Sequence, residues 1–199
     1  MKRLRGRSAR DEAWRAVAAR EGGESVEGKR SLAQVRFDHR AWTIILDQYT
    51  VSTGKSSATY TRMRTLLEPC LEFRFAMYRE NFMTRAGKLL GMRDVETANP
   101  LLDRDYLIRT NDEKMIRSLV ASSRIPELMA QQPTGKLELV KFRGRWGNRP
   151  ENVSELRWQT ASVLTEPHRL VLLVQTFREM LDRLVTIGAA RETRVDYPL

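Results

Sequence analysis

The stretch that decides the fold class is Leu71-Glu72-Phe73-Arg74-Phe75-Ala76-Met77-Tyr78. Along it the apolar residues Leu71, Phe73, Phe75 and Met77 occupy every second position. This two-residue period is typical of a strand with one buried and one wet face. Because a sheet with a wet face is usually antiparallel, the stretch predicts an antiparallel sheet.

Segments rich in aromatic and β-branched residues predict further strands on both sides of this stretch. They are residues 42–46, 49–51, 58–63, 106–109, 137–142 and 156–164. We therefore expect a sheet of about 5–7 strands.

The turn between two of these segments, Ser52-Thr53-Gly54-Lys55-Ser56, ends like a phosphate-binding loop. That motif needs a glycine five positions before Gly54, where Tyr49 stands, and a helix after the loop. The residues after Ser56 have the pattern of a strand instead. We therefore expect a hairpin tip in which Gly54 supplies a positive φ.

Helical patterns accompany the strands. A short helix is expected at residues 11–20, another at residues 81–90, and capping-box spacing at Thr110–Glu113 begins a third. The last helix is expected from Thr165 to about Ala190, where apolar residues recur near the 3.6-residue period. Strands and helices in separate groups predict an α+β fold, with helices on one face of the sheet and a long C-terminal helix across it.

Size and composition suit one globular domain, because the 199 residues are 41% hydrophobic and 30% charged. Half of the net charge of +10 comes from five cations, with no acid among them, in the first ten residues: Lys2, Arg3, Arg5, Arg7 and Arg10. We therefore expect a basic, disordered tail at residues 1–10 and a single α+β domain at residues 11–199.

The sequence also predicts where in the cell the protein is located. Uncharged runs are too short for a transmembrane segment. The chain has one cysteine, Cys70, and no pattern of a secretory signal, so a cytoplasmic location is expected.

The most distinctive polar segment is the connection Arg143-Gly144-Arg145-Trp146-Gly147-Asn148-Arg149. Arg143, Arg145, Trp146 and Arg149 form a candidate ligand-binding site, because an exposed aromatic ring can stack on a base while the cations meet phosphates. The same residues could anchor at a lipid interface. The alternative is that Trp146 folds back over the sheet and the arginines are solvated.

Other polar residues give no catalytic or metal-binding pattern. Asp103 and Asp105 have no third ligand at metal-site spacing, and His39 and His168 have no sequence-local partner for a zinc site or a triad. Cys70 lies in an apolar setting, which predicts a packed thiol. We expect no metal and no cofactor. An enzyme that uses Asp103, Asp105 or His39 in a scattered site remains an alternative.

The stretch from Leu102 to Glu113, Leu102-Asp103-Arg104-Asp105-Tyr106-Leu107-Ile108-Arg109-Thr110-Asn111-Asp112-Glu113, resembles a pattern in a family of uncharacterised bacterial proteins. In those proteins an aspartate precedes a short strand, which then opens a capped helix. The Tyr60-Thr61-Arg62-Met63-Arg64 strand and the long closing helix are similar to the same proteins. The resemblance covers most of the chain after the tail. It implies a fold and no activity, so it assigns no functional residue.

These patterns predict a non-enzymatic binding or interaction domain. One hypothesis is a small-molecule or lipid crevice between the sheet and the last helix, although the favoured interpretation of its lining residues is that they form the core: Phe73, Phe75, Met77, Phe177 and Leu181. A second is a nucleic acid or an anionic membrane surface bound through residues 1–10 and 143–149. A third is an enzyme with a scattered site. A homodimer through a sheet edge is compatible with each of them.

Overall fold

The protein is built around one large antiparallel sheet. A computed structural model describes residues 2–28, 32–52, 54, 56–79, 91–121, 123–132, 134–144 and 150–197. Its strands follow the order β1-β2-β3-β4-β9-β8-β5-β7-β6, and β10 pairs with β4. The strand bounds are β1 Glu24–Glu27, β2 Leu32–His39, β3 Trp42–Ser52, β4 Ser57–Pro69, β5 Phe75–Tyr78, β6 Arg93–Asp94, β7 Leu107–Thr110, β8 Lys136–Lys141, β9 Ser154–Thr160 and β10 Ala190–Arg191.

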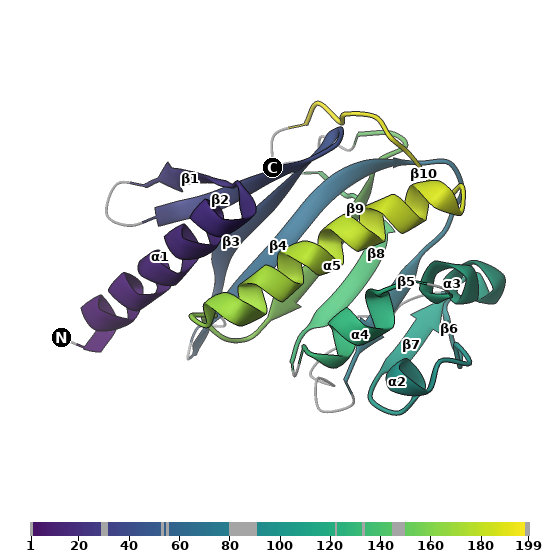
Figure 1. The fold of residues 1–199 in the computed structure, drawn as a ribbon, viewed down its shortest axis with the longest axis horizontal. Helices are drawn as coiled ribbons and strands as arrows, with labels where there is room; N and C mark the ends of the chain where they lie inside the picture. The colour runs from purple at the N-terminus through teal and green to yellow at the C-terminus, as the bar shows by residue number, and fades with distance from the viewer. Residues whose placement is uncertain are drawn as a thin grey trace.

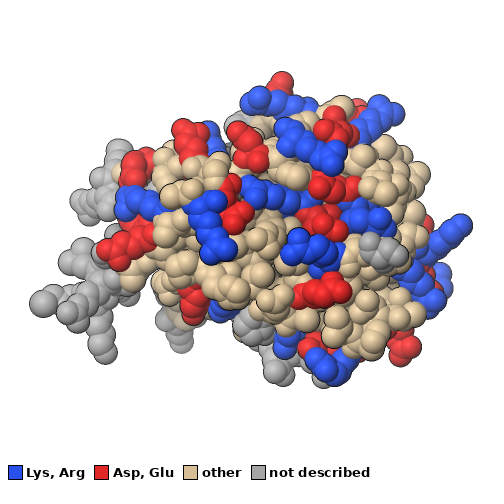
Figure 2. All heavy atoms as spheres, in the orientation of Figure 1, with Lys and Arg blue, Asp and Glu red and all other residues tan. Residues whose placement is uncertain are grey.

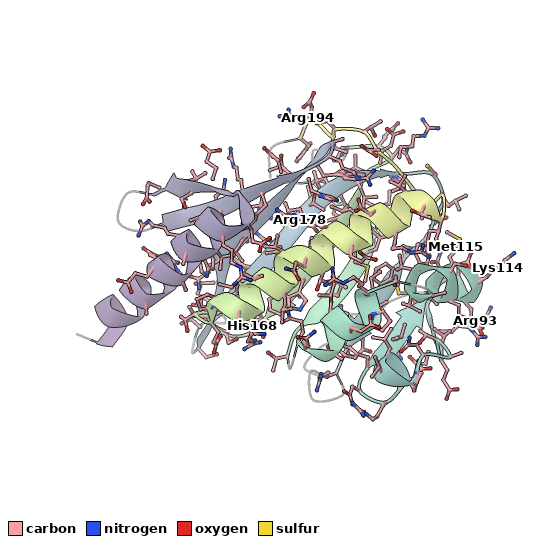
Figure 3. The ribbon with its side chains drawn as sticks, in the orientation of Figure 1. Arg93, Lys114, Met115, His168, Arg178 and Arg194 are labelled. Atoms are coloured by element: carbon pink, nitrogen blue, oxygen red, sulfur yellow. The ribbon has the colours of Figure 1, made fainter. Side chains whose placement is uncertain are left out.

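The two long helices lie side by side across one face of this sheet (Figure 1). The helix bounds are α1 Lys2–Glu21, α2 Pro100–Asp103, α3 Glu113–Val120, α4 Ile125–Ala130 and α5 Pro167–Thr186. Arg178 of α5 ties the two helices together, because its Nη1 is 2.7 Å from Glu21 Oε2 and its Nη2 donates to the Glu21 carbonyl at 2.8 Å (Figure 3). The α+β class and the long C-terminal helix are therefore confirmed, while the sheet has more strands than expected.

The core lies between this helical layer and the sheet. Apolar side chains of α5, such as Leu173, Phe177 and Leu181, are buried against sheet residues such as Met63 and Leu156 in one continuous cluster. Trp14 of α1 is fully buried, and its Nε1 donates to the Leu164 carbonyl at 3.0 Å. Burial of one apolar stripe per helix is what holds the helices on the sheet.

The deciding stretch is shorter as a strand than expected. Strand β5 begins at Phe75, and Leu71 lies before it with half of its surface exposed, at 50%. All four residues of β5 are buried, so the expectation of a wet face on this strand was wrong. The strand is flanked by β8 and β7, and its Ala76 and Tyr78 are buried as fully as its Phe75 and Met77.

The β3–β4 turn has the geometry expected from the sequence, whereas two helices begin at other residues than expected. The β3–β4 hairpin turns at Gly54, whose φ is +79°, as expected. The N-cap of α3 is Asp112, which accepts from the Met115 amide at 3.0 Å, so the cap lies two residues after the position that the expected capping box gave to Thr110. Helix α1 begins at Lys2, well before the expected start at Asp11, and the helix expected at residues 81–90 lies outside the described residues.

Gly135, just before β8, tests how tightly the core is packed. Its φ is +127°, and a Cβ at this position would overlap the Trp158 ring. We expect Gly135→Ala to lower the free energy of unfolding by about 3 kcal/mol, because overpacking and backbone strain add. Gly54→Ala is the control, since its φ is also positive but no atom lies near the new Cβ, and it should cost about 1 kcal/mol. Equal losses in urea denaturation would contradict the packing of Gly135 on Trp158.

Candidate functional site

The candidate site lies on the sheet face that is turned away from α5, called the outer face below. Side chains alternate between the two faces of a strand. Met63 and Trp158 therefore point into the core, whereas their neighbours Arg62, Arg64 and Arg157 point to the outer face.

A row of seven alternating charges crosses the outer face over strands β3, β4, β9 and β8, and we call it the ionic chain. Its members in order are Arg62, Asp47, Arg64, Glu155, Arg157, Glu138 and Lys136. The successive nitrogen–oxygen distances are 2.7, 3.0, 3.9, 3.3, 2.6 and 2.5 Å. Each carboxylate is shared between two cations, so the network contains four cations and three anions.

The register of the sheet explains this arrangement. Asp47 is directly opposite Arg62, and Glu138 is directly opposite Arg157. Arg64 and Arg157 are also directly opposite one another, which would be repulsive by itself. Glu155 contacts both guanidinium groups and offsets that repulsion.

Four members of the ionic chain are buried, namely the three carboxylates and Arg64. Glu138 is 1% exposed and Arg64 is 4% exposed. Burial lowers the pKa of the Arg64 guanidinium and outweighs the effect of Asp47, so this pKa lies below its ordinary value. Burial acts in the same direction on Arg157, but the carboxylates outweigh it, so the pKa of Arg157 lies above its ordinary value. A charge buried in this way is stable only while its partners are present.

Two tyrosines continue the polar row toward the hairpin tip. The Arg62 guanidinium lies over the Tyr49 ring at 4.8 Å, and the Tyr49 hydroxyl donates to Gln159 Oε1 at 2.8 Å. Tyr49 stacks on its cross-strand neighbour Tyr60 with ring centroids 5.1 Å apart.

A cavity of about 720 Å³ opens beside the ionic chain. Its floor includes Ile45, which is directly opposite Arg64, and Leu66. The C-terminal segment, residues 192–197, forms one wall of this cavity with Arg194, Val195, Asp196 and Tyr197. The remaining lining comes from α1's end and strands β1 to β4, and includes Gly22, Gly23, Glu24, Arg36, Asp38, Ala41, Trp42, Thr43 and Thr65.

Apolar contacts hold the C-terminal segment on the outer face. Val195 and Tyr197 pack against a small cluster of Leu66, Phe142 and Val153, separate from the main core. The rings of Tyr197 and Phe142 meet edge to face at 5.2 Å. Side-chain packing of Val195 and Tyr197 thus holds this wall of the cavity in place.

A second cavity, also of about 720 Å³, lies on the other side of the molecule beside α3, α4 and α5. Ala98 lines it with a φ of +61°, and Glu179 Oε1 accepts from the Arg124 amide at 3.3 Å. Its lining is mainly the ends of short helices, and the outer face offers the larger and more varied set of side chains.

Of the four ligand-binding residues predicted from the sequence, Arg143 lies within the described residues. Arg143 is exposed just after β8, while Arg145, Trp146 and Arg149 lie outside the described residues. Arg10, from the expected tail, is buried in α1, pairs with Asp11 and donates to Gln48 Oε1 at 2.5 Å. Binding of an anionic partner by Arg143, Arg145, Trp146 and Arg149 stays a prediction, as does a homodimer.

The residues predicted to line a crevice between the sheet and the last helix pack together and fill that space. All five of its residues are at most 3% exposed and belong to the continuous core: Phe73, Phe75, Met77, Phe177 and Leu181. These side chains therefore form the core, which was the alternative stated for them.

The polar residues considered for catalysis have separate partners. Asp103 accepts from the Thr97 amide at 2.8 Å, and Asp105 pairs with Arg104 at 2.9 Å. His39 Nε2 lies 2.8 Å from Asp182 Oδ1. Thus the structure does not join them in one site, and no group of three or more metal-ligating side chains occurs among the described residues.

Cys70 departs from expectation because its thiol is exposed. It follows Pro69 at the end of β4, where its backbone amide donates to the Ala189 carbonyl at 2.9 Å. The apolar residues that neighbour Cys70 in the sequence therefore do not bury its thiol.

Comparison with known proteins adds one finding about the fold. No protein-family model and no curated protein sequence matches the chain. Among solved structures, the crystal structure of the mycobacterial trehalose monomycolate transport factor A, TtfA, is similar, with a TM-score of 0.52 and 9% identity. The match covers 96% of this chain and 99% of that chain, so the likeness extends over the whole architecture. Within the described residues, no helix is long and apolar enough to span a bilayer.

The ionic chain leads to a stability prediction. Glu138→Gln would leave Lys136 and Arg157 without their shared carboxylate, and we expect it to lower the free energy of unfolding by about 3 kcal/mol. Glu113→Gln is the matched control, because Glu113 pairs with Arg117 on an exposed helix surface and should cost less than about 0.5 kcal/mol. Urea denaturation of both variants measures the difference. A cost at Glu138 as small as that at Glu113 would show that the network does not stabilise the sheet.

Proposed function

We propose that the protein is a non-enzymatic binding domain that holds an amphiphilic ligand in the outer-face cavity. The observation that carries this proposal is the lining of the cavity, which combines apolar residues such as Ile45, Leu66 and Val195 with charged side chains of both signs. A volume of about 720 Å³ falls within the usual range for small-molecule sites.

The charges around the cavity favour a particular kind of head group. Arg36 and Asp38 come from one strand, and Arg194 and Asp196 come from the C-terminal segment. A ligand with one charge sign would meet attraction and repulsion together, because cations and anions alternate in the lining. A zwitterionic or neutral polar head can satisfy both. The apolar part of the ligand would contact Ile45 and neighbouring side chains.

The similar mycobacterial protein is a trehalose monomycolate transport factor, and it shares the fold of this chain. A binding role is compatible with that likeness. The cavity itself is defined by residues of this chain.

Fluorescence titration with an NBD-labelled lysophosphatidylcholine, kept below its micelle concentration, tests the proposal. We expect saturable binding to the unmodified protein. Thr43→Phe should raise the dissociation constant at least about tenfold, because Thr43 is a half-buried lining residue and the larger ring would fill the space.

Val140→Phe is the control, since Val140 is on the outer face of β8 but outside the lining of the cavity. It should leave the dissociation constant within about twofold, which is under 0.5 kcal/mol. Non-saturable binding, or equal effects of the two substitutions, would reject the cavity as the site.

A further inference from the structure

One end of the molecule brings together three segments that are distant in sequence. They are the first turns of α1 at residues 2–9, the outer part of the β3–β4 hairpin at residues 49–60, and the loop at residues 161–166; we call them together the basic end. Arg10 of α1 bonds to Gln48 of β3 at 2.5 Å, and Trp14 bonds to the Leu164 carbonyl at 3.0 Å. The helix, the hairpin and the loop therefore meet at these contacts.

The helix and the hairpin both continue past this meeting point in the same direction. Gly23, just after α1, lies beside Phe37, which is opposite Ile44 of β3, while Arg10 is beside Gln48. Helix α1 and strand β3 therefore run in opposite directions, and the N-terminal turns of α1 extend in the same direction as the part of β3 that follows Gln48. The eight residues of α1 before Arg10 extend about 12 Å farther at a rise of about 1.5 Å per residue.

The outer part of the hairpin leaves the rest of the sheet. The pairing of β2 with β3 ends at Asp47, and the pairing of β9 with β4 begins at Thr61. Beyond these points β3 and β4 pair with each other as far as Ser52 and Ser57. The hairpin thus extends past both neighbouring strands.

Charge at the basic end is mainly positive. Residues 2–9 of α1 contribute four cations and no acid, residues 49–60 contribute Lys55 and no acid, and residues 161–166 contribute one acid, Glu166. Elsewhere the basic and acidic side chains are interleaved, as on the face shown in Figure 2. The basic end therefore carries a net charge of +4 on 26 of the 199 residues, whereas the whole chain carries +10, so positive charge is denser here than in the rest of the chain.

Apolar side chains are exposed at the same end. Among the described residues, three large hydrophobic side chains are exposed, and Val51 and Val163 are two of them, each at 43%. Val51 lies in the hairpin, and Val163 follows Ser162, whose carbonyl accepts from the Thr61 amide at 3.2 Å. Cations beside exposed aliphatic groups are the combination that favours an anionic lipid surface.

We propose that the basic end docks reversibly on an anionic lipid bilayer. The cations would lie near lipid phosphates, and Val51 and Val163 would enter the interfacial region. Nucleic acid is the less suitable partner, because aliphatic side chains do not stack on bases and the nearby Tyr49 and Tyr60 already stack on each other. This location is independent of the proposed ligand cavity, which is lined by other residues.

Flotation with vesicles tests the proposal directly. The protein should float with phosphatidylcholine vesicles that contain about 30% phosphatidylglycerol, and not with pure phosphatidylcholine vesicles. Binding should be lost when salt is raised from about 0.1 M to about 1 M, because screening then shortens the reach of the charges. Substituting alanine for Lys2, Arg3, Arg5 and Arg7 together should lower the partition coefficient more than about a hundredfold, since each cation contributes about fivefold.

A charge-matched variant controls for net charge. It removes four cations outside the basic end, Arg93, Arg104, Lys114 and Lys141, of which Arg93 and Lys114 lie at the other end of the molecule (Figure 3). We expect this variant to keep partitioning within about fivefold of the unmodified protein. Equal losses in the two quadruple variants would overturn the proposal, because binding would then follow net charge alone.

The apolar residues separate a bilayer from nucleic acid as the partner. Val51→Ser with Val163→Ser should weaken vesicle binding about tenfold, because two aliphatic groups no longer enter the interface. The same variant should leave the binding of a 20-nucleotide RNA unchanged. Tighter binding to this RNA than to the anionic vesicles, together with no effect of the valine substitutions on the vesicles, would overturn the proposal. Lysolipid titration of each variant should be unchanged, so failure here is distinguishable from failure of the cavity proposal.

Discussion

The ionic chain from Arg62 to Lys136 is the constraint on which the central sheet depends. Its carboxylates are each held by two cations, and the three carboxylates and Arg64 are buried. A slip of one residue in any central strand would turn these charges into the apolar core and turn core side chains outward. Register is therefore specified from both faces of β3, β4, β9 and β8. Buried ion pairs give little net stability, so fixing the register is the role that such a network performs best.

The same constraint divides the molecule by function. Because charges occupy the middle of the outer face, the apolar stripes of α1 and α5 are buried on the opposite face. Space for a ligand then remains beside the ionic chain, next to the C-terminal segment, in the cavity that Ile45 and Leu66 help to line. The basic end lies where β3 and β4 extend beyond their neighbours. Ligand cavity and docking surface are thus separate, which allows each to be altered without the other.

Local periodicity was sufficient to predict the α+β class, the Gly54 hairpin and the long last helix, because each depends on residues close in sequence. It could not reveal the ionic chain, since Asp47, Arg64 and Glu138 meet only after four strands pair. The available signal was charge at alternate positions, as in Arg62 with Arg64 and Glu155 with Arg157. Periodicity also left two interpretations open for Phe75 and Phe177, a packed core and a crevice wall, because the same apolar pattern is typical of both. The cavity was missed because Val195 and Tyr197 form no regular pattern.

The central claim is that ligand binding belongs to the outer face and leaves the helical layer unused. Two-dimensional amide NMR during addition of lysophosphatidylcholine tests this claim most directly, because it reports every backbone position at once. The expected result is a set of shifted resonances from Arg36, Thr43, Ile45 and Val195, with the α5 resonances around Phe177 unchanged. Shifts concentrated on α5 and on β5 near Phe75 would contradict the account, since they would mean that the core between helix and sheet opens to admit the ligand.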